Sequence, residues 1–317
     1  MNMKIVDFTH EYINEANELA VICYNEERCY VPALPEISAV PDLSMFIDNG
    51  LGVAAFDGNK MTGFLCCYGP FDNAFGISGI RGVFSPMGGN AAIADNQAKI
   101  YAAMYQAAGE KWVRAGVVSH AISLYTHDTA TQELFFRYGF GLRCIDAIRE
   151  IDVIEMNEIA GFKFSLLRSD EIIELLPLEN LHMQGYLDSP FFMYRALQNE
   201  DEYVSEFDHE SIYVIARYNK KMVAYMMVEH SGETFIQDTP GYIHVNGAYC
   251  LPEFRGKGIS KYLLFKLMQI LKEQGYTRLG VDFESFNPTG SGFWLKHFSA
   301  YTHSVVRRID ENILGKK

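Results

Sequence analysis

Two glycines flank a lysine in the segment Arg255-Gly256-Lys257-Gly258-Ile259-Ser260, a combination suited to holding phosphate groups. Because glycine has no Cβ, the main-chain N–H groups of such a turn can converge on one point, and phosphate oxygens can approach them closely. A helix that begins near Gly258 adds unpaired N-terminal amides and the positive end of its dipole. Arg255 and Lys257 add positive charge. The segment therefore predicts a diphosphate site, and an ordinary basic turn that caps a helix is the alternative.

The elements that must position this loop are predicted from the periodicity around it. We expect a strand at 242–250, a loop at 251–257, a helix at 258–274 and a second strand at 278–283. Apolar side chains follow one stripe of the expected helix, which indicates that it covers a face of a sheet. A helix that links two strands in this way makes them candidates for parallel alignment.

Further strands and helices are expected upstream of this unit. A strand is predicted at 162–167, helical stretches at 169–184 and 190–204, and a hairpin of strands at 211–218 and 222–230.

Two other known phosphate-binding loops fit the segment Arg255–Ser260 poorly. A Walker loop needs Ser or Thr directly after Gly-Lys, and a dinucleotide fold needs the GxGxxG spacing.

The loop resembles the cofactor-binding motif of the GNAT (GCN5-related N-acetyltransferase) superfamily: Arg or Gln, two residues, Gly, one residue, then Gly or Ala. Ser260 is the one departure, and serine is small enough to keep the approach open. The resemblance implies that acetyl-CoA is the cosubstrate and that its acetyl group passes to a primary amine of a small molecule or peptide. It also implies that the diphosphate rests on the amides from Arg255 to Ser260 and that the pantetheine runs beside Cys250 and Leu251. The implied cofactor residues are Cys250, Leu251, Arg255, Gly256, Lys257, Gly258, Ile259, Ser260 and Asn287.

Two downstream positions concern the pantetheine arm and the departing thiolate. The resemblance places Asn287 where GNAT proteins present a side chain to the pantetheine, while a cap or turn before Pro288 is the alternative. It places Trp294 where many relatives carry a tyrosine that protonates the thiolate. Tryptophan has no usable acidic proton, so Tyr301, Tyr249 and solvent are the alternatives.

The attacking amine must be neutral, so a group that titrates near pH 7 is expected within reach of it. His244 is the first candidate, because it lies on the strand that leads into the loop and shares a face with Asn246. Glu229 and His230, at the end of the neighbouring strand, are alternatives. A hydrogen-bonded structural role is open for each of them.

The first half of the chain repeats the order of elements found in the second. We expect a hairpin of strands at 53–56 and 61–68, a strand at 76–84, a helix at 97–108 and a strand at 113–119. The fold class predicted is α/β with mixed sheets (α+β), as two tandem GNAT-like domains: a degenerate one at 1–155 and one with the acetyl-CoA loop at 156–317. The loop at 84–92 lacks the Arg/Lys pair, so the first domain is expected to have lost cofactor binding.

Composition restricts the partners and the location. With 27 Lys and Arg against 40 Asp and Glu, the net charge of −13 disfavours nucleic acid and anionic membranes and favours a cationic small molecule. The six cysteines form no CxxC pair, so no metal is expected. No segment of about 20 apolar residues and no secretory signal is recognised, which predicts a cytoplasmic protein, monomeric or homodimeric. Two rivals remain: a noncatalytic acyl-CoA-binding or regulatory protein, and an unrelated α+β interaction protein.

Overall fold

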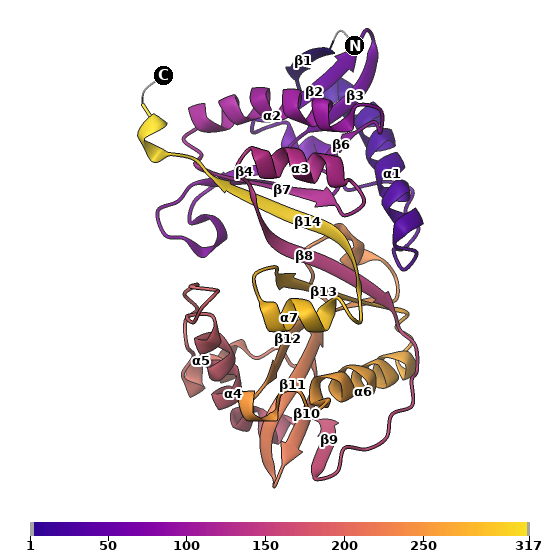
Figure 1. The fold of residues 1–317 in the computed structure, drawn as a ribbon, viewed down its shortest axis with the longest axis vertical. Coiled ribbons are helices and arrows are strands. Elements are labelled where there is room, and N and C mark those ends of the chain that lie inside the picture. The colour runs from indigo at the N-terminus through magenta and orange to yellow at the C-terminus, as the bar shows by residue number, and fades with distance from the viewer. Residues whose placement is uncertain (1–2, 316–317) are drawn as a thin grey trace. The chain divides into compact units, whose positions relative to one another are not determined.

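The chain folds into two compact units, each made of helices and strands (Figure 1). The structure is a computed structural model that describes residues 3–315. The first unit comprises the described residues up to Asp146 together with those from Ser299 onward, and the second comprises Ala147–Phe298. Strand β8 (Gly141–Glu150) begins in the first unit and ends in the second. The predicted boundary at residue 155 divides the sequence into two repeats and stays a prediction. The compact units are divided differently, because the last segment of the chain packs in the first unit.

The first unit contains a small antiparallel sheet with two long helices against it. Its strands are β1 (Met3–Asp7), β2 (Val53–Asp57), β3 (Lys60–Leu65) and β6 (Asn90–Ala92), in the order β1-β2-β3-β6. Helix α1 (Ile13–Tyr30) packs on β3 and β6, and α2 (Gln97–Arg114) packs on β2 and β3. Helix α3 (Thr129–Arg137) contacts α2.

A second group of strands in this unit includes the C-terminal strand. It contains β4 (Tyr68–Phe71), β5 (Gly82–Ser85), β7 (Ser119–Tyr125) and β14 (Ser299–Arg308). Strand β5 is parallel to β7, and β14 is antiparallel to β7 from Thr302–Tyr125 to Arg308–Ser119. This pairing is the reason why residues 299–308 belong to the first unit.

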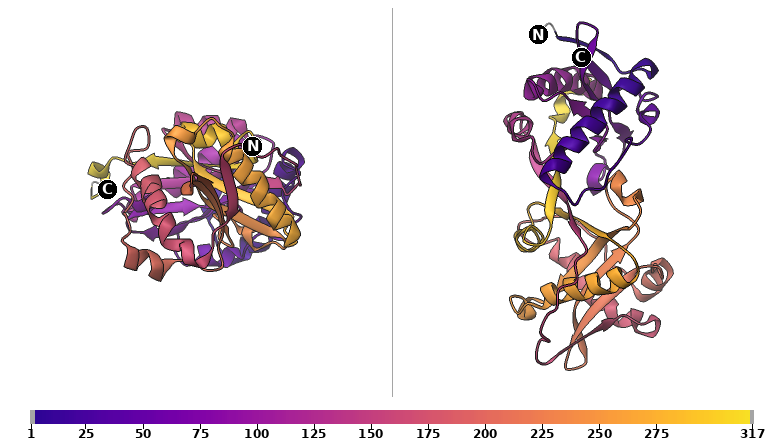
Figure 2. Two further views of the ribbon diagram at one scale, coloured as in Figure 1. Left: turned by 90° about the horizontal axis from the view of Figure 1, so that it is seen from below. Right: turned by 90° about the vertical axis from the view of Figure 1, so that its right-hand side faces the viewer.

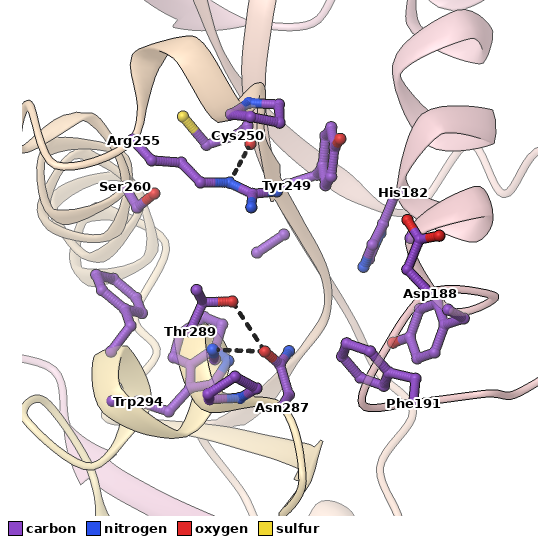
Figure 3. A pocket seen from close by; sticks show the side chains of 18 of the residues that line it. His182, Asp188, Phe191, Tyr249, Cys250, Arg255, Ser260, Asn287, Thr289 and Trp294 are labelled. Carbon is purple, nitrogen blue, oxygen red and sulfur yellow. Dashed lines mark hydrogen bonds between the residues drawn. The ribbon is translucent and has the colours of Figure 1, made fainter.

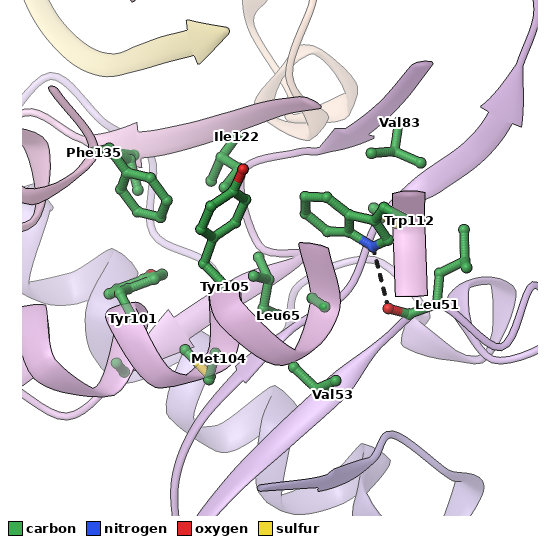
Figure 4. Close-up of a cluster of buried hydrophobic side chains, with 14 of the residues drawn as sticks. Leu51, Val53, Leu65, Val83, Tyr101, Met104, Tyr105, Trp112, Ile122 and Phe135 are labelled. Carbon is green, nitrogen blue, oxygen red and sulfur yellow. Dashed lines mark hydrogen bonds between the residues drawn. The ribbon is translucent and has the colours of Figure 1, made fainter. Parts of the chain in front are cut away.

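The core of the first unit forms where the apolar side of α2 meets the strands (Figure 4). Trp112 is fully buried, and its Nε1–H donates to the Leu51 carbonyl at 3.2 Å. Tyr105 packs edge-on against the rings of Trp112 and Phe135. These contacts bury large apolar side chains and satisfy the polar atom that accompanies them.

Two predictions for the first half are wrong in their bounds. The expected strand at 113–119 begins only at Ser119, because α2 continues to Arg114 and a turn with Gly116 at φ +78° follows. The apolar residues of 113–118 belong to the helix end and the turn, and short apolar runs do not distinguish helix from strand. The expected strand at 76–84 is confined to β5, and the loop after it leads into β6 rather than into a helix.

The second unit contains a mixed sheet. Its strands are β9 (Phe162–Leu166), β10 (Ile212–Tyr218), β11 (Lys221–Glu229), β12 (Tyr242–Cys250) and β13 (Arg278–Glu284), in that order, with the end of β8 beside β13. The hairpin of β10 and β11 turns at Asn219 and Lys220, both at positive φ. Strands β12 and β13 are parallel, which confirms the expected alignment.

Helices cover both faces of this sheet. Helix α6 (Ile259–Glu273) packs on β10, β11 and β12, and α4 (Ile172–Gly185) packs on β11 and β12. Figures 1 and 2 show α4 and α6 on opposite sides of these strands. Helix α7 (Pro288–Trp294) packs on β13. The predicted helix at 258–274 is confirmed within a residue at each end.

The segment between α4 and β10 departs from its prediction. Instead of a helix at 190–204, only α5 (Glu200–Glu206) forms, and residues 187–199 are irregular. The carbonyl of Asp188 accepts from the amides of Phe191 and Phe192, which closes a turn where the helix was expected. Short 3-10 helices lie at His10–Tyr12, Leu43–Phe46, Ala74–Gly76, Ser169–Glu171, Phe235–Asp238, Pro252–Phe254 and Glu311–Ile313.

The predicted class, α/β with mixed sheets, is confirmed by these two units. Within residues 3–315, no helix is long and apolar enough to cross a membrane.

Candidate active site

Strands β12 and β13 are paired along only part of their length, and a pocket opens where they separate. Their register runs from Tyr242–Arg278 to Val245–Val281, whereas β12 pairs with β11 as far as Cys250. Beyond Val245, the edge of β12 that faces β13 has no strand partner among the described residues. Ala248, Tyr249 and Cys250 of this stretch line a pocket of about 860 Å³. An open strand edge offers N–H and C=O groups to an extended ligand.

The loop before α6 forms one wall of this pocket, and the end of α4 with the segment that follows it forms the opposite wall. In Figure 3, Cys250, Arg255 and Ser260 lie on one side, and His182, Asp188 and Phe191 lie on the other. Asn287, Thr289 and Trp294 of the α7 region lie at the bottom of that view. A second pocket of about 360 Å³ shares Cys250, Arg255 and Ser260 with the first and extends past Gly258 to Lys261.

Six successive main-chain amides at the start of α6 have no hydrogen-bond partner within residues 3–315, those of Gly256 to Lys261. The amide of Arg255, just before them, donates to Pro252. Gly256 and Gly258 have φ values of +76° and +82°, a backbone conformation that favours glycine. Unpaired amides at a helix N-terminus attract anions, since they carry the positive end of the helix dipole. The loop therefore fits a diphosphate, and its donors are not occupied by internal partners.

Basic side chains surround these amides. The Nε–H of Arg255 donates to the Cys250 carbonyl at 3.0 Å, and its guanidinium carbon lies 5.5 Å from the centre of the Tyr249 ring. Lys261 and Lys296 line the second pocket. The Lys257 ammonium lies 5.0 Å from the centre of the Phe254 ring, and its side chain lines neither pocket. The positive charge that lines the two pockets therefore comes from Arg255, Lys261 and Lys296.

Most of the predicted cofactor residues line the two pockets. Cys250, Arg255, Gly256, Gly258, Ile259, Ser260 and Asn287 do so, whereas Leu251 and Lys257 do not. Leu251 is buried, and its amide donates to the Val223 carbonyl at 2.9 Å. Burial raises the pKa of the Cys250 thiol to about 11, although Arg255 opposes this. The thiol therefore stays protonated at neutral pH and is not a thiolate nucleophile.

Asn287 caps α7 and also lines the larger pocket. Its Oδ1 accepts from the Gly290 amide at 2.8 Å and from the Thr289 hydroxyl at 2.9 Å. No partner of its Nδ2 is found in the described part of the chain. Of the two alternatives for this residue, the cap is observed, and the amide nitrogen can still donate to a ligand. Trp294 lines the same pocket with its side chain 8% exposed.

The prediction of His244 as a general base is not supported by its position. The side chain is 1% exposed, its Nδ1 is 2.7 Å from the Tyr242 hydroxyl, and its Nε2 is 2.9 Å from Asp282 Oδ1. It does not line either pocket. With both ring nitrogens engaged inside the protein, His244 cannot take a proton from a substrate without breaking one of these bonds. The predicted alternation did not reveal what covers the face of β12 on which His244 lies, and a register shift at residues 245–247 interrupts the alternation between His244 and Asn246.

The other predicted catalytic residues also lie outside the pocket linings. Glu229 accepts hydrogen bonds from Asn246 Nδ2 and the Ser211 hydroxyl. His230 Nε2 lies 2.9 Å from the Tyr276 hydroxyl. Tyr301 is buried in β14 of the first unit. Tyr249, the alternative to Tyr301, does line the larger pocket.

His182 and Asp188 are pocket residues that the sequence did not single out. His182 Nδ1 lies 3.0 Å from the Tyr225 hydroxyl, and the ring stacks on Tyr249 with centroids 5.3 Å apart. Burial, with the positive charges of Arg195 and Arg255, lowers the pKa of His182 to about 4. Its imidazole is therefore neutral at pH 7. The one signal in the sequence was a histidine near the end of an apolar helix, which is equally typical of a core residue.

Metal ligands do not gather at this site. Nowhere in the described range 3–315 do three His, Cys, Asp or Glu side chains come together in a way that could hold a metal ion.

Residues 176–298 match the family model described as the acetyltransferase (GNAT) family. This range contains the loop before α6 and almost all of both pocket linings. A search of curated proteins finds no match.

Two solved structures share the fold. A GCN5-related N-acetyltransferase from Sphaerobacter thermophilus is 10% identical with a TM-score of 0.59, covering 96% of this chain and 95% of that chain. The glucosamine N-acetyltransferase region of a fungal multi-domain GH3 β-N-acetylglucosaminidase is 12% identical with a TM-score of 0.51, covering 96% of this chain and 38% of that chain. At such identities the likeness concerns the fold alone, and it confirms the prediction of two GNAT-like domains.

Proposed function

We propose that this protein transfers an acetyl group from acetyl-CoA to a primary amine of a small molecule or peptide. The match of residues 176–298 to the GNAT acetyltransferase family model supports this proposal. Acyl transfer in general is the chemistry of this family. The observation that carries the finer proposal is the row of unpaired amides from Gly256 to Lys261, which lies beside two adjoining pockets of about 860 and 360 Å³.

The cofactor follows the loop and the open edge of β12 in this proposal. The diphosphate accepts hydrogen bonds from the free amides, and Arg255, Lys261 and Lys296 balance its charge. The pantetheine lies beside residues 248–250, where β12 has no strand partner on the side of β13, and Asn287 Nδ2 donates to it. The acetyl thioester then lies in the larger pocket near Tyr249.

The chemistry requires a C–N bond to form and a C–S bond to break. The amine lone pair attacks the thioester carbonyl carbon, the amine loses one proton, and the coenzyme A thiolate leaves and takes up one proton. Tyr249 is the proposed donor to the thiolate. Burial raises the pKa of Tyr249 although Arg255 lowers it, so its hydroxyl is protonated throughout the neutral range.

His182 is the proposed acceptor of the amine proton. A nitrogen that has bonded to the carbonyl carbon is far more acidic than a free ammonium, so a neutral imidazole of low pKa is a sufficient base. The tautomer required has Nδ1–H donating to the Tyr225 hydroxyl and Nε2 unprotonated. Positioning of both substrates in one pocket supplies much of the rate enhancement.

A noncatalytic acyl-CoA-binding protein is the second candidate. The observation that favours it is Trp294, which lines the pocket where the motif resemblance places a tyrosine acid. Such a protein binds acetyl-CoA without turnover.

Thiol release with acetyl-CoA and a panel of primary amines, measured together with calorimetric binding of acetyl-CoA, tests the two candidates. The proposal expects binding and turnover with at least one amine. Binding without turnover by any amine contradicts the transferase and supports the second candidate. Absence of binding contradicts both.

A further inference from the structure

Charge is divided between the two sides of the larger pocket. Arg255 and Lys296 line the side near the loop before α6, and Asp188 is the one carboxylate among the described residues that line the pocket. In Figure 3, Asp188 and Arg255 lie on opposite sides of the cavity. Apart from the neutral His182, no other lining residue is ionisable with a pKa in the acidic or neutral range. An anionic ligand is therefore favoured at one side and a cationic ligand at the other.

The backbone holds Asp188 in place. Its carbonyl accepts from the amides of Phe191 at 2.9 Å and Phe192 at 3.1 Å, and the Met193 amide donates to the Tyr186 carbonyl at 2.8 Å. The carboxylate itself is exposed and has no side-chain partner within residues 3–315. The turn therefore fixes the backbone of Asp188 and leaves its carboxylate available to a ligand cation.

Aromatic rings surround this side of the pocket. The centroid of Tyr186 lies 5.0 Å from that of Phe191 and 5.5 Å from that of His182, and His182 stacks on Tyr249. The guanidinium of Arg195 lies 5.2 Å from the centre of the Tyr186 ring, and Glu284 at 3.9 Å partly balances its charge. Ring faces attract ammonium groups through their quadrupole, most strongly where water is partly excluded.

From these observations we infer that the acceptor carries a second cationic group besides the amine that is acetylated, and that Asp188 and the rings of Tyr186 and Phe191 bind this second group. The inference rests on the proposed function and names its substrate class: diamines, polyamines and amines with a guanidinium group.

The bound cation cannot be the nucleophile. A carboxylate stabilises the protonated form of a neighbouring amine and raises its pKa, which keeps the lone pair from attacking. The reacting nitrogen must instead lie toward Tyr249 and Cys250, where no carboxylate lines the pocket. An acceptor with two amino groups satisfies both requirements, with one nitrogen held as a cation and the other free to lose its proton.

The test compares butylamine with butane-1,4-diamine, which has the same carbon chain and one more amino group. We expect kcat/KM for the diamine to exceed that for the monoamine about tenfold through KM. Asp188→Asn should abolish that preference by raising the KM for the diamine more than the KM for the monoamine. Asp201→Asn, which removes an exposed carboxylate of α5 that lines neither pocket, is the matched control and should keep the preference.

Calorimetric titration of both amines into the protein saturated with CoA gives a readout that needs no turnover. If no amine of the panel is acetylated but the diamine binds more tightly and loses this advantage in Asp188→Asn, Asp188 binds a cation as inferred and the transferase proposal falls. Equal affinity for the two amines, or an equal loss for both in Asp188→Asn, overturns the inference. Because Asp188 is exposed, the preference should also weaken as ionic strength rises.

Discussion

Replacing Gly258 by Asp tests the diphosphate site, because it places a carboxylate beside the unpaired amides. A Cβ at Gly258 meets only Ile159 Cδ1, at 4.0 Å, so the substitution introduces no steric clash. The positive φ of +82° costs about 1–2 kcal/mol of unfolding free energy for a side chain other than glycine. At about 5 Å and an effective dielectric constant of about 40, one carboxylate repels one phosphate by about 1.7 kcal/mol.

With two phosphates in reach, the repulsion is on the order of 2–3 kcal/mol, which corresponds to roughly a 30- to 150-fold rise in the Kd for acetyl-CoA. Calorimetric titration measures this rise, and urea unfolding measures the stability. Gly258→Asn introduces a side chain with the shape of Asp but without its charge. It therefore separates the effect of backbone strain from that of charge and should raise the Kd for acetyl-CoA only a few-fold.

Gly275 provides a second control for the same helix. It follows α6 at φ +91°, and a Cβ there meets nothing within 4 Å. Gly275→Asp should lower the stability and leave the affinity for acetyl-CoA unchanged. An unchanged Kd in Gly258→Asp, or an equal loss in Gly258→Asp and Gly275→Asp, refutes the reasoning.

The remaining predictions concern a tyrosine and two histidines. Tyr249→Phe should lower kcat roughly 10- to 100-fold, because it removes the proton donor, and should leave the Kd for acetyl-CoA unchanged. Steady-state kinetics measure kcat and calorimetry measures the Kd. An unchanged kcat contradicts the proposed role of Tyr249. His244→Gln should lower the melting temperature but keep kcat within about threefold, because His244 lies outside the pocket. A larger loss of kcat contradicts this. Burial lowers the pKa of His120 to about 4, so the unfolded chain binds more protons between pH 6.5 and 4 and stability falls as pH falls through that window. Urea unfolding should show a loss of about 3 kcal/mol from this residue, at about 1.4 kcal/mol per pH unit, and His120→Gln should flatten the slope; an unaltered slope contradicts the assignment.

The elements around the loop were predictable because the glycine positions and the apolar periodicity there indicate the same strand, turn and helix. The glycines at 256 and 258, the amphipathic stretch of α6 and the glycine at 275 fix a strand, a turn and a helix without information from elsewhere. The helix that carries His182 was expected, but the part of the wall that carries Asp188 was not predictable. Asp188 lies about 70 residues from the loop in sequence, in an irregular segment whose turn depends on backbone hydrogen bonds that periodicity does not reveal.

Two further features of the structure could not be predicted from the sequence, each for a physical reason. The pairing of β14 with β7 joins residues more than 170 positions apart, and no local pattern in either strand specifies its partner. The role of His244 depended on what covers its face of β12, where Tyr242 and Asp282 occupy both ring nitrogens. Alternation along a strand gives the face of a residue but not its neighbours.

Amide chemical shifts of the loop on addition of coenzyme A, recorded by 15N–1H TROSY NMR with pantetheine as the control ligand, test whether these amides hold the diphosphate. Large saturable shifts are expected at Gly256, Gly258 and Ser260 with coenzyme A and small ones with pantetheine, which lacks the diphosphate. Saturable binding of coenzyme A that leaves these amides unshifted, or equal shifts with pantetheine, contradicts this role of the amides.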